Sequence, residues 1–144
     1  MVKLIQYLKE KYKGDVILYF TARFPEHKAL YIQLTSQDVL ILFKQGYRVN
    51  NRLKANCDVE IAHRITYDIE NNNVNKIILV SGDGDFVSLL DYAREKIESV
   101  RCFCVHPRNT STMIKERLYL EVTYMFDIID LLQKREIPDT DLPV

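Results

Sequence analysis

A continuous apolar run, KIILVS at residues 76–81, limits the possible folds of this chain more than any other segment. It is followed by a helix-like segment, DFVSLLDYAREKI at 85–97, and by a second strand-like run, SVRCFCVH at 99–106. An apolar run without polar alternation is typical of a strand that is buried on both faces of a parallel sheet. Strand, helix and strand in this order predict a βαβ unit.

The same alternation extends over most of the chain. Apolar residues at helical spacing predict helices over 2–13, over 29–45 with a break near 35–36, over 57–71, and over 112–135 with a break before Tyr124. Segment 15–24 is predicted to be a strand, and segment 47–53 is predicted to be a short strand that leaves a loop. We therefore expect a three-layer α/β/α domain with a mostly parallel sheet. A single domain is expected over 1–134, with a polar tail at 135–144.

Composition excludes several function classes. Lys plus Arg and Asp plus Glu both number 20, so the formal net charge is zero and binding of nucleic acid by bulk charge is disfavoured, although a local basic patch stays open. No apolar run reaches the ~20 residues that cross a bilayer, so no membrane partner is expected. The first 14 residues do not have the pattern of a signal peptide. The three cysteines lack metal-binding spacing and are predicted to be reduced, buried thiols of a cytoplasmic protein.

Two aspartates end the apolar run at 76–81. Asp83 and Asp85 alternate with Gly82 and Gly84, at a strand end where α/β proteins bind ligands. Two carboxylates this close repel one another, and a hard cation such as Mg²⁺ or Mn²⁺ would remove the conflict. The glycines are expected to turn the backbone tightly and to leave space above the carboxylates. As the alternative, Asp85 caps the helix that starts at Phe86, with Asp83 in the turn.

A third carboxylate, Asp58, stands at the start of the helix predicted over 57–71. Taken alone, it is explained as a helix cap or as a partner of the helix dipole. Together with Asp83 and Asp85, it is better explained as a member of a metal-binding cluster.

The segment SGDGDF at 81–86 resembles the SGDxDF signature of the NYN domain family, which belongs to the PIN-like nuclease superfamily. Upstream, residues 44–65 are similar to the family's glycine turn, strand, lysine and helix-opening Asp-Val. Downstream, residues 100–129 resemble its last core strand, its Ser/Thr-bearing loop and its C-terminal helix. The similarity covers roughly residues 15–132; SGDGDF is specific, and the other segments gain weight from their order.

The resemblance implies metal-dependent hydrolysis of RNA, which would make the chain a ribonuclease. In that family, acidic residues surround one or two Mg²⁺ or Mn²⁺ ions, and RNA, here expected to be single-stranded, is the partner. Carried over by position, the catalytic residues and metal ligands are Asp58, Asp83 and Asp85.

The substrate-binding residues that the resemblance implies are Ser81, Lys54, Asn109, Thr110 and Ser111. Ser81 would orient a carboxylate or a metal-bound water, and the other four would contact phosphate. Each has a plain alternative, since residues 110–112 can cap the next helix and Lys54 can be solvated. We expect a local RNA-binding patch formed by Lys54, Arg52, Arg48, Arg108 and Lys115.

The chain departs from the family pattern at its start. Family members begin with an apolar strand that carries an aspartate, whereas this sequence begins inside a helix. The position six residues after Asp58, often a second carboxylate, is Arg64, and Asp68 follows further along. The sequence is thus a fragment or has a misassigned start, or another chain supplies the strand, for instance in a homo-oligomer, or the sheet is rearranged without catalysis. Two functions follow: a ribonuclease that the missing aspartate could impair, or a non-catalytic RNA- or protein-binding module.

Overall fold

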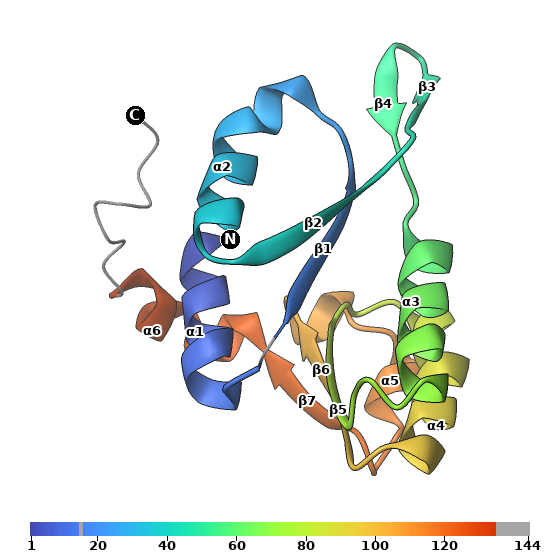
Figure 1. Cartoon of the computed structure of the whole chain (residues 1–144). Coiled ribbons are helices and arrows are strands. Elements are labelled where there is room, and N and C mark those ends of the chain that lie inside the picture. The colour runs from blue at the N-terminus through green and yellow to red at the C-terminus, as the bar shows by residue number, and fades with distance from the viewer. Residues whose placement is uncertain (15, 135–144) are drawn as a thin grey trace. The chain divides into compact units, whose positions relative to one another are not determined.

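The computed structural model describes residues 1–14 and 16–134 (Figure 1). The chain divides into two compact units: the first contains Met1–Cys57 and Leu131–Val144, and the second contains Asp58–Asp130. The expectation of one domain over 1–134 stays a prediction, and the expected polar tail at 135–144 lies outside the described residues. Within the described residues, no helix is both long and apolar enough to span a bilayer.

The first unit opens with a helix, as predicted. Its elements are α1 (Val2–Tyr12), β1 (Ile17–Ala22), the 3₁₀ turn η1 (Pro25–His27), α2 (Lys28–Ser36), β2 (Val39–Lys44), β3 (Tyr47–Val49) and β4 (Arg52–Lys54). α1 ends where Lys13 adopts a left-handed conformation with φ 50°. The buried side chains of Ile5, Leu34 and Val39 pack α1, α2 and β2 together.

The prediction of a helix over 29–45 is wrong for its second half. Asp38, with φ 59°, follows the end of α2, and residues 39–44 form β2, which pairs in parallel with β1 from Ile17↔Val39 to Ala22↔Lys44. A short apolar run such as VLILFK fits a helix or a strand equally well by periodicity. Residues 39–44 form a strand because their backbone pairs with that of β1.

The segment 47–54 is a β-hairpin, whereas the sequence was expected to give one short strand and a loop. β3 and β4 are antiparallel, and Val49 pairs with Arg52 across a two-residue turn. The turn residues Asn50 and Asn51 have φ 50° and 60°. Two consecutive left-handed residues are the requirement of the tight hairpin turn that matches strand twist, and asparagine tolerates that conformation.

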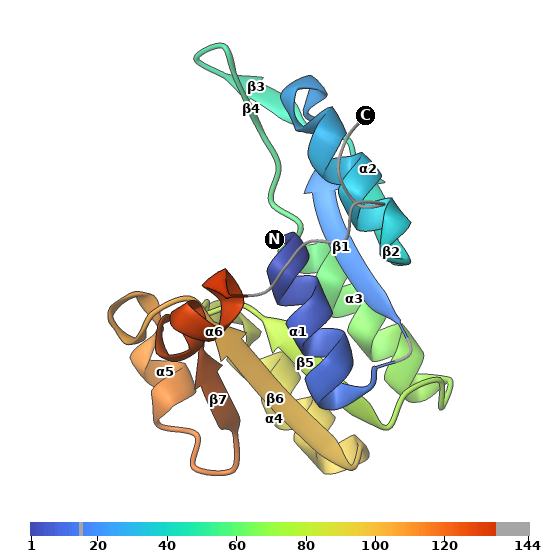
Figure 2. The same ribbon diagram turned by 90° about the vertical axis from the view of Figure 1, so that its left-hand side faces the viewer.

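The second unit is built on a parallel sheet, as the βαβ pattern predicted, so the α/β fold class is confirmed. Its elements are α3 (Asp58–Glu70), β5 (Lys76–Val80), η2 (Gly84–Phe86), α4 (Val87–Lys96), β6 (Ser99–Cys104), η3 (Pro107–Asn109), α5 (Thr112–Lys115), β7 (Glu121–Tyr124), η4 (Met125–Ile128) and α6 (Ile129–Gln133), which crosses into the first unit. β6 lies between β5 and β7, and both pairings are parallel (Figure 2).

Two expectations for the second unit are corrected. Residues 121–124 are the strand β7, not part of a helix over 112–135, because they pair with β6 from Arg101↔Glu121 to Cys104↔Tyr124. β5 is not buried along its length. Leu79 is its buried residue, while Lys76 and Val80 are exposed.

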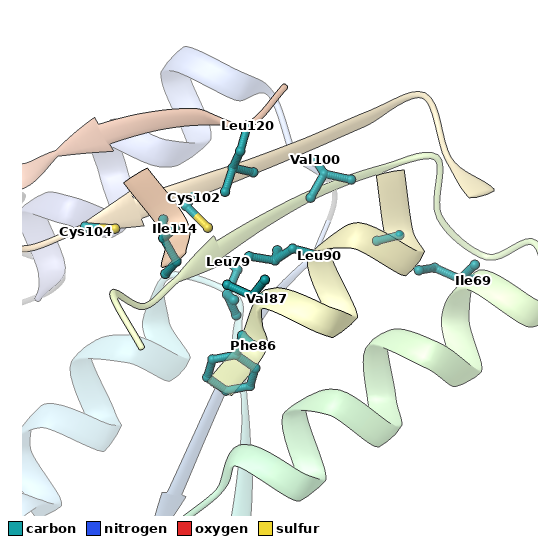
Figure 3. Packing of buried hydrophobic residues seen from close by; sticks show 11 residues of the cluster. Ile69, Leu79, Phe86, Val87, Leu90, Val100, Cys102, Cys104, Ile114 and Leu120 are labelled. Carbon is teal, nitrogen blue, oxygen red and sulfur yellow. The ribbon is translucent and has the colours of Figure 1, made fainter. Parts of the chain in front are cut away.

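The core of the second unit lies between its helices and its sheet (Figure 3). Ile69 from α3, Leu90 from α4 and Leu79 from β5 belong to one buried cluster, together with Cys102 and Cys104 from β6. Burial raises the pKa of the Cys102 thiol to about 12, so this thiol stays protonated. The prediction of buried thiols is therefore confirmed for Cys102 and Cys104 and wrong for Cys57, which is half-buried. The Cys104 thiol also donates to the Ser81 carbonyl at 3.3 Å.

Candidate metal centre

The second unit brings three predicted carboxylates together. Asp58 opens α3, and Asp83 and Asp85 follow the carboxyl end of β5. One carboxylate oxygen from each residue lies within 4.8 Å of the other two. Asp83 and Asp85 are exposed, Asp58 is half-buried, and neither Asp83 nor Asp85 pairs with a cationic side chain in the described part of the chain. The centre is therefore locally anionic and open to solvent.

Hydrogen bonds fix the turn that carries Asp83 and Asp85. The Asp83 N–H donates to Ser81 Oγ at 3.1 Å, and the Asp85 N–H donates to Asp83 Oδ1 at 2.9 Å. Asp83 is thus the N-cap of η2, so the alternative in which Asp85 provides the cap is wrong. The Asp85 carboxylate accepts no hydrogen bond from the described residues, which leaves both of its oxygens available to a cation.

Gly82 and Gly84 are required for a different reason from the one the sequence suggested. Neither has a positive φ, so the turn does not need glycine for its backbone conformation. Instead, a Cβ atom on Gly84 would lie 2.5 Å from Ser111 Oγ, and one on Gly82 would lie 3.3 Å from the Asn109 carbonyl oxygen. The missing side chains make room for the loop over residues 109–111.

That loop is attached directly to the aspartate turn. The Ser111 N–H donates to the Gly82 carbonyl at 2.9 Å, while Ser111 Oγ accepts from the Met113 N–H at 3.2 Å and caps α5. Thr110 is buried, and its hydroxyl donates to the His106 carbonyl at 3.0 Å. The two hydroxyls already have partners within the fold.

The turn and the loop form the walls of one cleft. Its volume is about 710 Å³, and it is lined by residues 81–85, Arg108–Ser111 and Met113. Asn109 is exposed there, and its side chain makes no hydrogen bond in the described part of the chain. The exposed Arg108 adds a cation to the cleft. The sequence placed Arg108 only in a general basic patch. Its position beside the aspartates could not be predicted, because it depends on how the loop folds.

A polar clamp that the sequence did not reveal holds the segment after α5 against α4. Arg117 donates to both carboxylate oxygens of Asp91, at 3.3 and 3.1 Å, and the Tyr119 hydroxyl donates to the same carboxylate. The Arg117 guanidinium and the Tyr119 hydroxyl keep the pKa of Asp91 below its usual range. The clamp joins residues 26 and 28 positions apart, and nothing in their local pattern indicates the contact.

Two other residues singled out in the sequence, Lys54 and Asp68, are not among the three clustered carboxylates. Lys54 belongs to the first unit, where its side chain is exposed on β4. Asp68 pairs with Arg64 at 2.7 Å one turn away on α3, and it also accepts from Asn73. Asp68 is therefore committed to a structural ion pair.

The geometry of the three carboxylates fits a small divalent cation. An octahedral Mg²⁺ with bonds of about 2.0–2.1 Å places opposite ligands about 4 Å apart, and it usually keeps several waters. The separations within 4.8 Å need only small side-chain rotations to reach that geometry, and the exposure of Asp83 and Asp85 leaves room for waters. Three carboxylate oxygens are also the donor type that Mg²⁺ and Mn²⁺ prefer.

A parallel α/β fold with three carboxylates at a strand end defines a protein with a candidate divalent-metal centre. The NYN domain model matches residues 1–123, so the chain belongs to the NYN domain family, within the PIN-like nuclease superfamily. A crystal structure of a protein of unknown function from Vibrio parahaemolyticus RIMD 2210633 is similar in fold, with a TM-score of 0.58 and 21% identity over 84% of this chain and 87% of that chain. No curated protein matches this chain.

Replacing Gly84 by Ala is expected to destabilise the second unit. The new methyl group would lie 2.5 Å from Ser111 Oγ, so the cap of α5 must move, at a cost of about 1–3 kcal/mol. Gly14→Ala is the matched control, because a Cβ there meets nothing within 4 Å. Urea denaturation of both variants measures the difference, and equal stabilities would mean that the loop does not press on Gly84.

Proposed function

We propose that this NYN domain is a metal-dependent ribonuclease that hydrolyses phosphodiester bonds of single-stranded RNA at the centre formed by Asp58, Asp83 and Asp85. The observation that carries the proposal is the convergence of three carboxylate oxygens within 4.8 Å. Membership of the NYN family supports it, since NYN domains generally bind RNA and PIN-like nucleases generally use divalent metals. When bound, Mg²⁺ or Mn²⁺ would activate a water molecule and stabilise negative charge at phosphorus.

The chain's own residues would divide the work. Asp58 and Asp85 offer carboxylates that hold the cation, and Asp83 combines this with its cap of η2 through a single oxygen. Ser81 accepts the Asp83 N–H and so keeps the turn in place. These contacts preorganise the ligands before a cation arrives, which is the requirement for a tight site.

Substrate contacts are proposed from the other wall of the cleft. The Asn109 side-chain amide makes no hydrogen bond to the described residues, and Arg108 supplies a positive charge for a phosphate. Thr110 and Ser111 would act chiefly by holding the loop, because their hydroxyls are already bonded. Lys54, on β4, is proposed as a further contact to a phosphate of the RNA. The free cysteines support a reducing compartment, for which we propose the cytoplasm.

Mn²⁺ is expected to raise the melting temperature of the full chain. A ligand that binds only the folded state at 100 times its Kd adds about 2.7 kcal/mol, which for a chain of this size corresponds to roughly 5–10 °C. Asp83→Asn should keep the melting temperature measured in EDTA, because asparagine caps as well as aspartate. It should lose most of the Mn²⁺ effect. Differential scanning calorimetry with and without Mn²⁺ checks both results.

The same calorimetric measurements could also contradict the proposal. An unchanged melting temperature in millimolar Mn²⁺ would remove the metal from the proposal. An equal Mn²⁺ effect in wild type and in Asp83→Asn would place the cation elsewhere. Metal binding without any RNA cleavage would favour the non-catalytic binding module.

A further inference from the structure

The β3–β4 hairpin and its flanks carry a concentration of positive charge. Residues 39–57 contain Lys44, Arg48, Arg52 and Lys54 and no Asp or Glu, in a chain whose charges balance overall. A local excess of this kind creates a positive potential that attracts polyanions, even where the net charge is zero. The hairpin is the site of most of this excess, since three of the four cations lie in β3 and β4.

The strand register sorts the hairpin side chains onto two faces. Tyr47 lies opposite Lys54, and Val49 lies opposite Arg52, so these four side chains share one face, which we call the basic face. Arg48 and Leu53 lie opposite one another on the second face. Leu53 packs against Gly46, where a Cβ atom would lie 2.6 Å from Leu53 Cδ1. The second face is thereby anchored to its own unit.

The basic face is exposed, and its polar side chains have no side-chain partners among the described residues. Tyr47 is 55% exposed and Val49 is 39% exposed. In the described part of the chain, Arg52, Lys54 and Tyr47 make no ion pair or side-chain hydrogen bond. Lys44, just before the hairpin, differs, because its ammonium donates to the Asn56 carbonyl at 2.6 Å. Figure 1 shows the hairpin as a separate two-stranded ribbon beyond the end of β2.

We propose that the basic face of the β3–β4 hairpin binds single-stranded RNA, a proposal that rests on the proposed ribonuclease function and assigns it a substrate-holding surface. On the basic face, the exposed ring of Tyr47 lies opposite one cation, Lys54, and diagonal to a second, Arg52. An exposed ring beside cations can stack on an unpaired base while the cations contact the adjacent phosphates. Double-stranded RNA offers no unstacked base to Tyr47, so the ring favours a single strand. The tight Asn50–Asn51 turn sets the register of the two strands and so determines which side chains share the basic face.

The chain connection gives the hairpin a role in the reaction. Three residues separate Lys54 from Asp58, so their Cα atoms cannot be more than about 14 Å apart in any arrangement of the two units. RNA held on the basic face is thus tethered near the first ligand of the metal centre. Holding the substrate in this way raises its effective concentration at the centre.

Fluorescence anisotropy of the full chain with a labelled oligouridine, in EDTA, tests the proposal without catalysis. The double variant Arg52→Gln/Lys54→Gln should weaken binding by about tenfold or more, and it should reduce the slope of log K against log salt by about 1.4, or about 0.7 for each lost phosphate contact. Tyr47→Leu should weaken binding by about fivefold or more, and Tyr47→Phe should restore it, because phenylalanine keeps the ring.

The matched control is Lys28→Gln/Arg94→Gln, which removes two exposed cations that do not belong to the hairpin, and it should leave binding and salt slope unchanged. Equal losses in both double variants would overturn the proposal in favour of a general charge effect. Equal affinity for single-stranded and double-stranded RNA would also overturn the proposal. Competition by polyglutamate as strong as competition by unlabelled RNA would overturn it too, because it would indicate an acidic protein partner. Because binding is measured without metal, failure of the hairpin can be told from failure of the nuclease. Normal RNA binding without cleavage in Mn²⁺ contradicts only the nuclease. Normal cleavage by the Arg52/Lys54 variant contradicts the hairpin proposal and the phosphate contact of Lys54, and leaves the proposed metal centre intact.

Discussion

Replacing Asp85 by Asn is expected to reduce the rate of RNA cleavage in Mn²⁺ by at least about 100-fold. Asp85 is the aspartate of the cluster whose carboxylate accepts no hydrogen bond from the described residues, so its charge is available to a cation. Lewis-acid stabilisation by a bound metal is worth several kcal/mol, and each 1.4 kcal/mol is tenfold in rate. The exposed site should accept asparagine without loss of fold. Gel analysis of a labelled single-stranded RNA gives the rate.

Glu95→Gln is the matched control for Asp85→Asn. Both changes replace an exposed carboxylate by its amide, and Glu95 lies near the far end of α4, about 13 Å along the axis from Phe86. Its cleavage rate should equal that of the wild type. Cleavage that persists both in Asp85→Asn and in EDTA would remove this centre from the mechanism. A wild-type chain that binds RNA and Mn²⁺ but does not cleave would show that three carboxylates hold a cation without turnover.

The candidate centre could be predicted from the sequence because its residues follow a local rule. Asp83 and Asp85 directly follow an apolar strand, and Asp58 directly opens an amphipathic helix, so each aspartate has a fixed place at the end of an element. In such a fold, the first residues of the helix that precedes a strand lie at the same edge of the sheet as the carboxyl end of that strand. Proximity of the three oxygens therefore follows from the fold class.

The features that escaped prediction depend on contacts between distant segments. β2 and β7 are short apolar or β-branched runs whose strand state comes from pairing with β1 and β6. The roles of Gly82 and Gly84 depend on a loop that approaches from residues 109–111. The β3–β4 hairpin is the exception, because Asn50–Asn51 between two short runs is a local signal for a tight turn.

Replacing Ile114 by Ala is expected to lower the free energy of unfolding by about 2–5 kcal/mol, a large part of the 5–15 kcal/mol that stabilises a typical domain. Ile114 is fully buried on the single-turn helix α5, in the same core as Leu90 and Cys104, and truncation leaves a cavity that a packed core cannot easily close. Urea denaturation measures the effect.

Leu118→Ala is the matched control for this truncation, since it removes a side chain of the same size that is 99% exposed, and its stability should change by less than about 0.5 kcal/mol. Equal losses in the two variants would contradict the packing of α5. The consequence for the centre is specific. Because α5 begins at Ser111, whose N–H donates to Gly82, loosening Ile114 should speed hydrogen exchange at the Ser111 amide, whereas Leu118→Ala should not. A faster Ser111 amide in Ile114→Ala alone would show that the wall of the cleft is held by the core beneath it.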